Sequence, residues 1–228
     1  MKIPVIINNR NLLTYPKNML EELKTFDSIG EIIIVDNGST YEPLLDWYNT
    51  KPCEIIKTAN NGHLCPWIID LPKKLSLDYY VVTDPDLDLT ETPKDSLLFL
   101  KEKIISNPKY NKIGLSLKNW LVSEDSPYYD FLKKWAETTW DPQSIHDGLL
   151  INQKIDTTFA IYSIHKNHIG ESCATYSPYS VNHIPWEFTK NYIEDIETQN
   201  YEYYNYLVNS NSSSSYKWFI NNKGINKI

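Results

Sequence analysis

Short runs of apolar, mostly β-branched residues alternate along the first 118 residues with longer stretches in which apolar side chains recur at helical spacing. Runs that are apolar at nearly every position are typical of strands buried on both faces, as in parallel sheets. Their alternation with helices predicts an α/β fold. The predicted strands span Ile3–Asn8, Glu31–Asp36, Glu54–Thr58, Tyr79–Thr83 and Lys112–Leu117.

The stretches between these strands carry helix signals. Pro16 suits the first turn of a helix, where a missing N–H costs nothing. Met19, Leu20 and Leu23 then supply the apolar stripe of that helix. The other predicted helices span Tyr41–Tyr48, Pro66–Lys74, Pro93–Ser106 and Tyr128–Thr139.

Beyond about residue 140 the alternation becomes irregular. Thr157–Ser163 and Cys173–Tyr176 have strand-like composition, and Thr189–Val208 has helical spacing. The polar run Asn209–Ser215 is typical of a flexible linker. Tyr216–Ile220 is a short aromatic patch that could pack back on the domain or contact a partner.

Length and charge narrow the class of protein. A chain of 228 residues suits one large domain over residues 1–208, with a regular half (1–118), a mixed half (119–208) and a linker and tail (209–228). Twenty-two basic against 29 acidic residues give a net charge of −7, which is the wrong sign for a protein that binds a phosphate backbone. We therefore expect no nucleic-acid partner.

Cysteine content and hydropathy favour a cytoplasmic location. The three cysteines, Cys53, Cys65 and Cys173, are too few for a disulfide framework or a four-thiolate zinc site. The first apolar run, Ile3–Ile7, is too short for a signal-peptide core, and no run approaches the ~20 apolar residues of a membrane span. Peripheral contact with a membrane surface stays open, and the sequence does not specify an oligomeric state.

Polar segments follow four of the predicted strands, at residues 8–11, 36–40, 60–63 and 84–88. Ligands of open parallel sheets bind beyond the carboxyl ends of the strands, so these segments would line one edge. Each segment taken alone also fits a turn, because turns favour Asn, Asp and Gly. Arg10 is the only arginine, so an anionic ligand here would rely on a metal, lysine or backbone amides.

Two carboxylates meet after the fourth strand. Asp84 and Asp86 would repel each other unless a cation lay between them, and oxygen ligands suit Mg²⁺ or Mn²⁺. A helix-capping loop is the alternative, since a threonine at position 90 or 92 followed by Pro93 is also typical of the start of a helix. An EF-hand loop is excluded because Leu89 occupies its glycine position. The sequence also lacks the glycine motifs of dehydrogenases, P-loop NTPases and serine hydrolases.

Three segments, in this order, resemble the GT-A glycosyltransferases, especially the small family-2-like enzymes of bacterial surface polysaccharides. They are Ile3–Asn11 (IPVIINNRN), Ile32–Thr40 (IIIVDNGST) and Tyr80–Leu89 (YVVTDPDLDL). Ile155–Tyr162 and Ser177–Trp186 also resemble segments of a small bacterial subgroup. The resemblance covers roughly residues 3–190. It implies a GT-A, Rossmann-like fold, with a mostly parallel sheet flanked by helices and a mixed C-terminal acceptor region.

The resemblance also implies a site for a nucleoside-diphosphate sugar in residues 1–118. Asp36 would accept a hydrogen bond from the pyrimidine ring, and Asp84 would lie near the ribose. The donor-site residues that the resemblance implies are Asn8, Asn9, Arg10, Asp36, Asn61 and Asp84.

The metal and the catalytic base are assigned on the same resemblance. Asp84, Asp86 and His183 are the implied ligands of Mn²⁺ or Mg²⁺, although His183 could equally be a core or surface histidine. Asp156 and then Glu171 are the candidates for the base that takes the acceptor proton. A capping or turn residue is the alternative for Asp156.

The resulting hypothesis is a metal-dependent glycosyltransferase that transfers a sugar from a nucleoside diphosphate, UDP above all, to a glycan or glycolipid acceptor. A sugar-nucleotide nucleotidyltransferase is one alternative, although residues 8–15 lack the glycine- and basic-rich loop expected of it. A non-catalytic glycan-binding or scaffold domain on the same fold is the other. The tryptophans that could offer flat faces to a sugar are Trp67, Trp120, Trp140 and Trp186.

Overall fold

The structure is a computed structural model, and it describes residues 2–75, 78–118, 124, 129–139, 142–150, 153–155 and 158–184. The helix predicted at 189–208, the linker at 209–215 and the aromatic patch at 216–220 lie outside these ranges.

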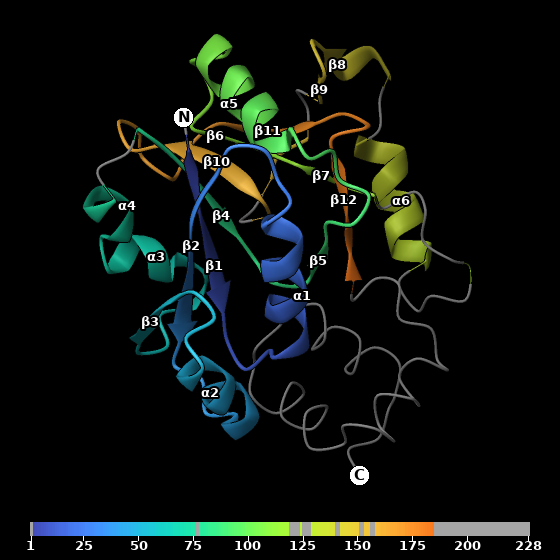
Figure 1. The fold of residues 1–228 in the computed structure, drawn as a ribbon. Coiled ribbons are helices and arrows are strands. Elements are labelled where there is room, and N and C mark those ends of the chain that lie inside the picture. Colours follow the sequence, from blue (N-terminus) through green and yellow to red (C-terminus); the bar gives the residue numbers. More distant parts are fainter. Residues whose placement is uncertain are drawn as a thin grey trace.

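Within the described residues, a nine-stranded sheet forms the centre of the molecule (Figure 1). The first four strands along the chain run parallel to one another, β10 (Ala160–Ser163) is antiparallel between β4 (Tyr79–Thr83) and β6 (Lys112–Gly114), and β11 (Ser172–Thr175) is parallel to β6. The mostly parallel sheet expected from the sequence is therefore confirmed. In spatial order the strands are β3 (Glu54–Thr58), β2 (Ile29–Asn37), β1 (Ile3–Asn9), β4 (Tyr79–Thr83), β10 (Ala160–Ser163), β6 (Lys112–Gly114), β11 (Ser172–Thr175), β9 (Leu149–Leu150) and β8 (Ile145–His146).

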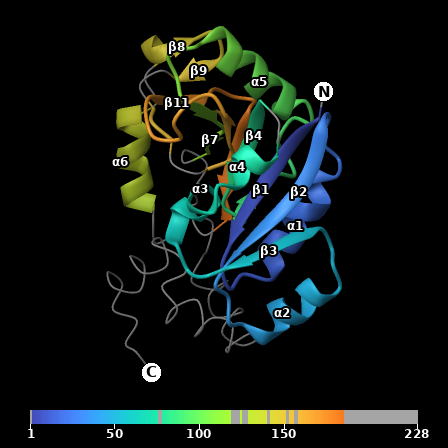
Figure 2. The same ribbon diagram turned by 90° about the vertical axis from the view of Figure 1, so that its left-hand side faces the viewer.

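Helices cover both faces of this sheet, because successive strand residues point to opposite sides. Val5 and Ile7 of β1 pack with Met19 of the first helix, whereas Ile6 between them packs with Cys65 on the other face. Figure 2 shows α3 and α4 on the side of the sheet opposite α1 and α2. The helices are α1 (Thr14–Leu23), α2 (Glu42–Asn49), α3 (Cys65–Ile68), α4 (Leu71–Lys74), α5 (Ser96–Ser106) and α6 (Tyr129–Thr139), with 3₁₀ turns η1 (Gly62–Leu64) and η2 (Pro142–Ser144).

The strand predicted at Lys112–Leu117 is two strands in two sheets. Its first part is β6 of the large sheet, and its second part, β7 (Ser116–Leu117), joins a small sheet in the order β5 (Leu87–Asp88), β12 (Ser180–His183), β7. Leu115 lies between them, and its N–H donates to the carbonyl of Phe159 at 3.2 Å, in register with the antiparallel pairing of β6 and β10.

The helix predicted at Pro66–Lys74 is also divided, into α3 and α4. Asp70, between them, adopts a left-handed conformation with φ 55°. Pro72 lies in the first turn of α4, where it has no N–H to continue the ladder of α3. Proline therefore explains the break as well as the restart.

Other boundaries differ less from the prediction. Glu54–Thr58 and Tyr79–Thr83 are confirmed as β3 and β4, whereas α5 begins at Ser96 because Pro93 and Ser96 form a turn. The short strands β5, β8, β9 and β12 were not predicted. Since β10 pairs with both β4 and β6, the two halves predicted for the domain share one sheet.

The order of the strands fixes where a ligand can bind. The chain passes from β1 outward to β2 and β3, and then returns to place β4 on the other side of β1. Such a reversal opens a crevice at the carboxyl ends of the two strands beside it. No helix within the described residues is long and apolar enough to cross a membrane.

Candidate functional site

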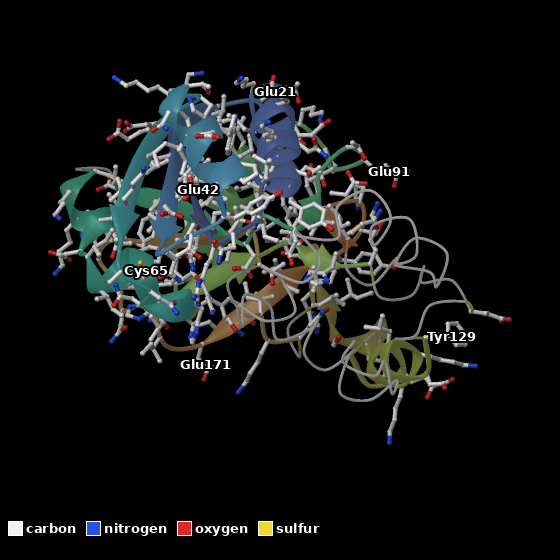
Figure 3. The ribbon with its side chains drawn as sticks, turned by 90° about the horizontal axis from the view of Figure 1, so that it is seen from below. Glu21, Glu42, Cys65, Glu91, Tyr129 and Glu171 are labelled. Carbon is white, nitrogen blue, oxygen red and sulfur yellow. The ribbon has the colours of Figure 1, made fainter. Side chains whose placement is uncertain are left out.

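Buried polar atoms without partners gather at the carboxyl ends of β1, β2 and β4, the edge that faces the viewer in Figure 3. Among the described residues, Asn8 Oδ1, Asp36 Oδ1, Asp86 Oδ1 and Arg10 Nε are buried and have no hydrogen-bond partner. Most buried polar atoms in folded proteins are paired. Several unpaired ones at the crevice of the sheet therefore indicate a site that a polar ligand completes.

Asp36 is the last but one residue of β2, where it lies opposite Asn9 of β1 and is 3% exposed. Burial raises the pKa of the Asp36 carboxyl, while hydrogen bonds from the side chain and backbone of Ser39 lower it. The charges of Lys57 and Arg10 also lower this pKa. Asp36 thus presents an unpaired carboxylate oxygen in a low-dielectric pocket, which suits recognition of a ligand N–H.

Asn11 joins the loop after β1 to the loop after β2. Its Oδ1 accepts hydrogen bonds from the backbone N–H of Thr40 (2.8 Å) and of Tyr41 (3.3 Å), and its own N–H donates to Ser39 Oγ (2.9 Å). Asn11 is fully buried and has φ 59°, a conformation that asparagine tolerates better than most residues. Sequence reasoning did not assign this role, and an Asn in the turn beyond a strand was the available signal.

Asn37 makes the equivalent link to the loop after β3. Its Oδ1 accepts from the N–H of Asn61 (2.6 Å), and its Nδ2 donates to the carbonyl of Gly62 (2.7 Å). Gly38 must be glycine, because its φ is +70° and a Cβ there would lie 2.8 Å from the backbone N of Asn60. Asn37 and Gly38 therefore fix the third loop against the second strand.

Three predicted donor-site asparagines support this edge in different ways. Asn9 is fully buried, and its Nδ2 donates to the Leu12 carbonyl (2.9 Å) and to Tyr48 Oη (2.7 Å). The Nδ2 of Asn9 is thus used inside the fold, whereas its Oδ1 is buried without a hydrogen-bond partner, so a contact of Asn9 with a nucleoside stays a prediction. Asn8 Nδ2 donates to the Gly62 carbonyl (3.3 Å), and Asn61 Nδ2 bonds within its own loop.

Asp86 and His183 lie close together in the site. The Oδ2 of Asp86 lies 3.6 Å from Nε2 of His183, and both side chains are nearly buried. The contact exists because β12 pairs antiparallel with β5, opposing His183 to Leu87, and the Ile184 N–H donates to the Asp86 carbonyl at 3.0 Å. Burial raises the pKa of Asp86 to about 6 and lowers the pKa of His183 to about 3. The imidazole is therefore neutral at working pH, as a metal ligand must be.

The pair fits a divalent cation on the chemistry of its donors. The carboxylate of Asp86 and the neutral imidazole of His183 are suitable ligands, and Asp86 Oδ1 lacks a partner. Within the described residues no group of three or more His, Cys, Asp or Glu side chains could hold a metal. The predicted set Asp84, Asp86 and His183 is therefore not brought together as a three-residue cluster among the described residues, and Asp84 lies half-buried just after β4. A cation at the pair would take its other ligands from a bound diphosphate or from water.

The structure describes only one of the two predicted catalytic bases. Asp156 lies outside the described residues, as do Trp120, Trp140 and Trp186. Glu171 precedes β11, and the registers through β10 and β6 place it level with Tyr79, about 13 Å before the end of β4 at ~3.3 Å per residue. Its side chain is exposed and points outward at the rim (Figure 3). The direction of β11 thus places Glu171 away from Asp86, and its role as a base stays a prediction.

Comparison with known proteins gave matches only among solved structures: no family model matches the chain, and the search of curated proteins gave no match. S. aureus TarS is 15% identical with a TM-score of 0.51, over 97% of this chain and 43% of TarS. Glucosyl-3-phosphoglycerate synthase from Mycobacterium tuberculosis, in complex with Mn²⁺, uridine diphosphate and glucosyl-3-phosphoglycerate, is 13% identical with a TM-score of 0.44, over 71% and 56%. CMP:2-keto-3-deoxy-manno-octonic acid synthetase, complexed with CTP, is 12% identical with a TM-score of 0.38, over 51% and 53%.

The likeness to TarS extends over nearly all of this chain and concerns the fold. It confirms the GT-A type of fold, a mostly parallel sheet flanked by helices. This chain spans about half the length of each of the three proteins.

Proposed function

We propose that this protein is a metal-dependent glycosyltransferase that transfers a sugar from a UDP-sugar to a glycan or glycoconjugate acceptor. The observation that carries the proposal is the group of unpaired buried atoms at one strand edge, with the Asp86–His183 pair beside them. The order of the motifs that resemble GT-A glycosyltransferases is consistent with it.

The uracil ring would lie against Asp36. A buried carboxylate oxygen without a partner can accept the N–H of a pyrimidine such as uracil. The loops that Asn11 and Asn37 fix would form the walls of the nucleoside pocket, and Asn8 Oδ1 is a further acceptor there. Because these side chains are held by short hydrogen bonds within the fold, the pocket would be formed before the ligand arrives.

The diphosphate would lie near Asp86 and His183, which would hold Mn²⁺ or Mg²⁺, with Asp84 nearby. A divalent cation in this position supplies positive charge to the departing diphosphate. Arg10, the only arginine, would add a second positive charge through its buried Nε. Together these groups would compensate for the lack of an arginine cluster.

Asp156 is the proposed base for the acceptor hydroxyl. β10 runs antiparallel to β4, so its first residue, Ala160, lies opposite Val82 near the carboxyl end of that strand. The chain that enters β10 therefore comes from the side of Asp84 and Asp86. This direction supports Asp156 and not Glu171 as the group that takes the proton.

The donor site is tested by a thermal-shift panel of UDP, GDP, CDP and dTDP, each with and without Mn²⁺. At a hundredfold excess over Kd, a ligand adds about 2.7 kcal/mol to the free energy of unfolding. For a chain of this size that raises the melting temperature by about 5–10 °C. We expect this shift for UDP with Mn²⁺, its loss in Asp86→Ala, and its retention in Asp46→Ala, a control at an exposed aspartate of α2. A shift of equal size in Asp86→Ala would refute the metal site.

Transfer itself is tested by incubating the protein with UDP-sugars and Mn²⁺ and measuring released UDP and free or transferred sugar by mass spectrometry. Release or transfer that needs Asp86 supports the glycosyltransferase. Formation of a sugar nucleotide from a nucleoside triphosphate and a sugar phosphate would instead indicate the nucleotidyltransferase. Binding of UDP with neither reaction would leave only a binding domain on this fold.

A further inference from the structure

A cavity of about 250 Å³ lies on the face of the large sheet that carries α3. Its walls come from η1 and α3, from β6 and β10, and from the chain at residues 154–155, 168–170 and 172. Lys112, Lys154, His63 and His168 line it, and none of the described residues that line it is an aspartate or glutamate. In a chain with a net charge of −7, this cavity is a local region of positive charge.

The cavity has a rigid aromatic wall. Trp67 donates from Nε1 to Tyr80 Oη (2.9 Å), stacks on His168 with ring centroids 4.6 Å apart, and meets the ring of Tyr162 edge-on at 5.2 Å. Lys112 Nζ lies 5.8 Å from the centre of the Tyr162 ring, so a cation and two aromatic rings share the same wall. Such walls suit the apolar face of a sugar ring, with charge supplied beside it.

Two walls of the cavity continue along the chain into segments of the proposed donor and acceptor sites. His63 and Leu64, in one wall, directly follow Asn61 and Gly62, the loop residues that Asn37 fixes. Ile155, in another wall, directly precedes the proposed base at position 156, and its N–H donates to Ser172 Oγ at 3.2 Å. A group held in the cavity would therefore contact the residues that directly follow the donor loop and the residue that directly precedes the proposed base.

We propose that this cavity binds an anionic group of the acceptor, a phosphate or carboxylate carried on a sugar, through Lys112 and Lys154. The inference rests on the proposed function, since it names the class of acceptor that the transferase would use. The volume is below the ~300–1,000 Å³ of sites for drug-sized ligands, so it suits one sugar unit or one phosphate group.

Two further observations agree with an anionic occupant. The pKa of His168 is lowered, first by burial and then by the charge of Lys112, so positive charge is already felt inside the cavity. The neighbouring cavity on the other side of the Trp67–His168 stack contains Asp70, which pairs with Lys73 at 3.1 Å. The cavity with Lys112 and Lys154 is thus the more positive of the two.

The test is an NMR titration of the full chain with glucose 6-phosphate, glucuronate and glucose, following the amide signals of Ile155 and Gly170, two residues of the cavity wall. We expect both anionic sugars to shift these signals and glucose to shift them at least about 10-fold less at the same concentration. Lys112→Ala/Lys154→Ala should weaken anion binding by about 10-fold or more. Lys154→Glu, at an exposed position, should abolish it.

The matched control is Lys24→Ala/Lys134→Ala, which changes the net charge equally at two exposed helix-associated lysines and should bind like the parent. Binding of glucose 6-phosphate alone or of glucuronate alone also supports the site and identifies the anion as phosphate or carboxylate. Equal shifts with glucose, or unchanged binding in both cavity variants, would overturn it. The thermal shift caused by UDP with Mn²⁺ is measured on the same variants. If the parent protein shows no such shift, the proposed donor site is refuted. If the cavity variants keep this shift but lose anion binding, the substitutions have affected the cavity and not the donor site.

Discussion

Replacing Asp86 by asparagine should stabilise the metal-free protein at pH 8. Burial raises the pKa of this carboxyl from 3.8 to about 6, so the folded state binds the proton more tightly than the unfolded state does. The stabilising contribution of that proton is fully present below pH ~3.8 and is lost as the pH rises through about 6. At pH 8 the folded protein therefore holds a buried charge that the asparagine variant lacks.

The magnitude follows from the size of the shift. About two pH units correspond to about 3 kcal/mol at ~1.36 kcal/mol per unit. At roughly 2–4 °C per kcal/mol, Asp86→Asn should melt about 6–12 °C above the parent at pH 8. His183 contributes in the opposite direction, because its lowered pKa makes the fold lose stability as the pH falls below 6.5. His183 Nε2 lies 3.6 Å from the Asp86 carboxylate, so the substitution also changes the pKa of His183, and the two proteins are compared at pH 8, where the imidazole is neutral in both.

The assay is a melting curve of each protein at pH 4, 6 and 8, with EDTA and then with Mn²⁺ and UDP. The higher melting temperature of Asp86→Asn should vanish near pH 4. At pH 8 with Mn²⁺ and UDP the parent should have the higher melting temperature, because only the parent binds the metal. Asp46→Asn, an exposed substitution, should leave the melting temperature within about 1–2 °C, for ~0.5 kcal/mol or less. If Asp86→Asn melts with or below the parent at pH 8 in EDTA, or gains equally at pH 4 and pH 8, the account of a buried, unpaired carboxylate is incorrect.

Three further comparisons of variants test the arrangement of the site. Asn37→Ala removes two short hydrogen bonds to the third loop and should cost about 2–3 kcal/mol in a denaturant titration, with weaker UDP binding; an unchanged midpoint would contradict the link. Gly38→Ala should lower the melting temperature more than Gly62→Ala, because both have φ near +70° but only Gly38 has a backbone atom within 3 Å of the added Cβ; equal losses would exclude that contact as the cause. Glu171→Gln should keep full transferase activity, whereas Asp156→Asn should lower kcat by about 10²-fold or more, and the reverse result would exchange their roles.

The first part of the fold could be predicted from the sequence because its strands are buried on both faces. Runs such as Ile3–Asn8 and Tyr79–Thr83 are apolar at consecutive positions, and only a strand covered by helices on two sides satisfies that pattern. The parallel arrangement then brings the strand ends to one edge, so Asp36 and Asp86 could be predicted as neighbours of a common site without coordinates. The composition of each segment was sufficient to predict these strands, because their hydrophobic pattern is a property of consecutive residues.

What the tertiary structure alone decided are the contacts between segments that lie far apart along the chain. His183 reaches Asp86 because two short strands pair, and strands of two to four residues leave too little periodic signal to predict. Glu171 is held away from that edge by the direction of β11, which follows from pairing with β6 and not from its neighbours in sequence. Asn37 orients a loop that starts more than 20 residues later. The sequence determined which residues are polar at the strand ends, whereas long-range pairing determined which of them face a ligand and which are used inside the fold.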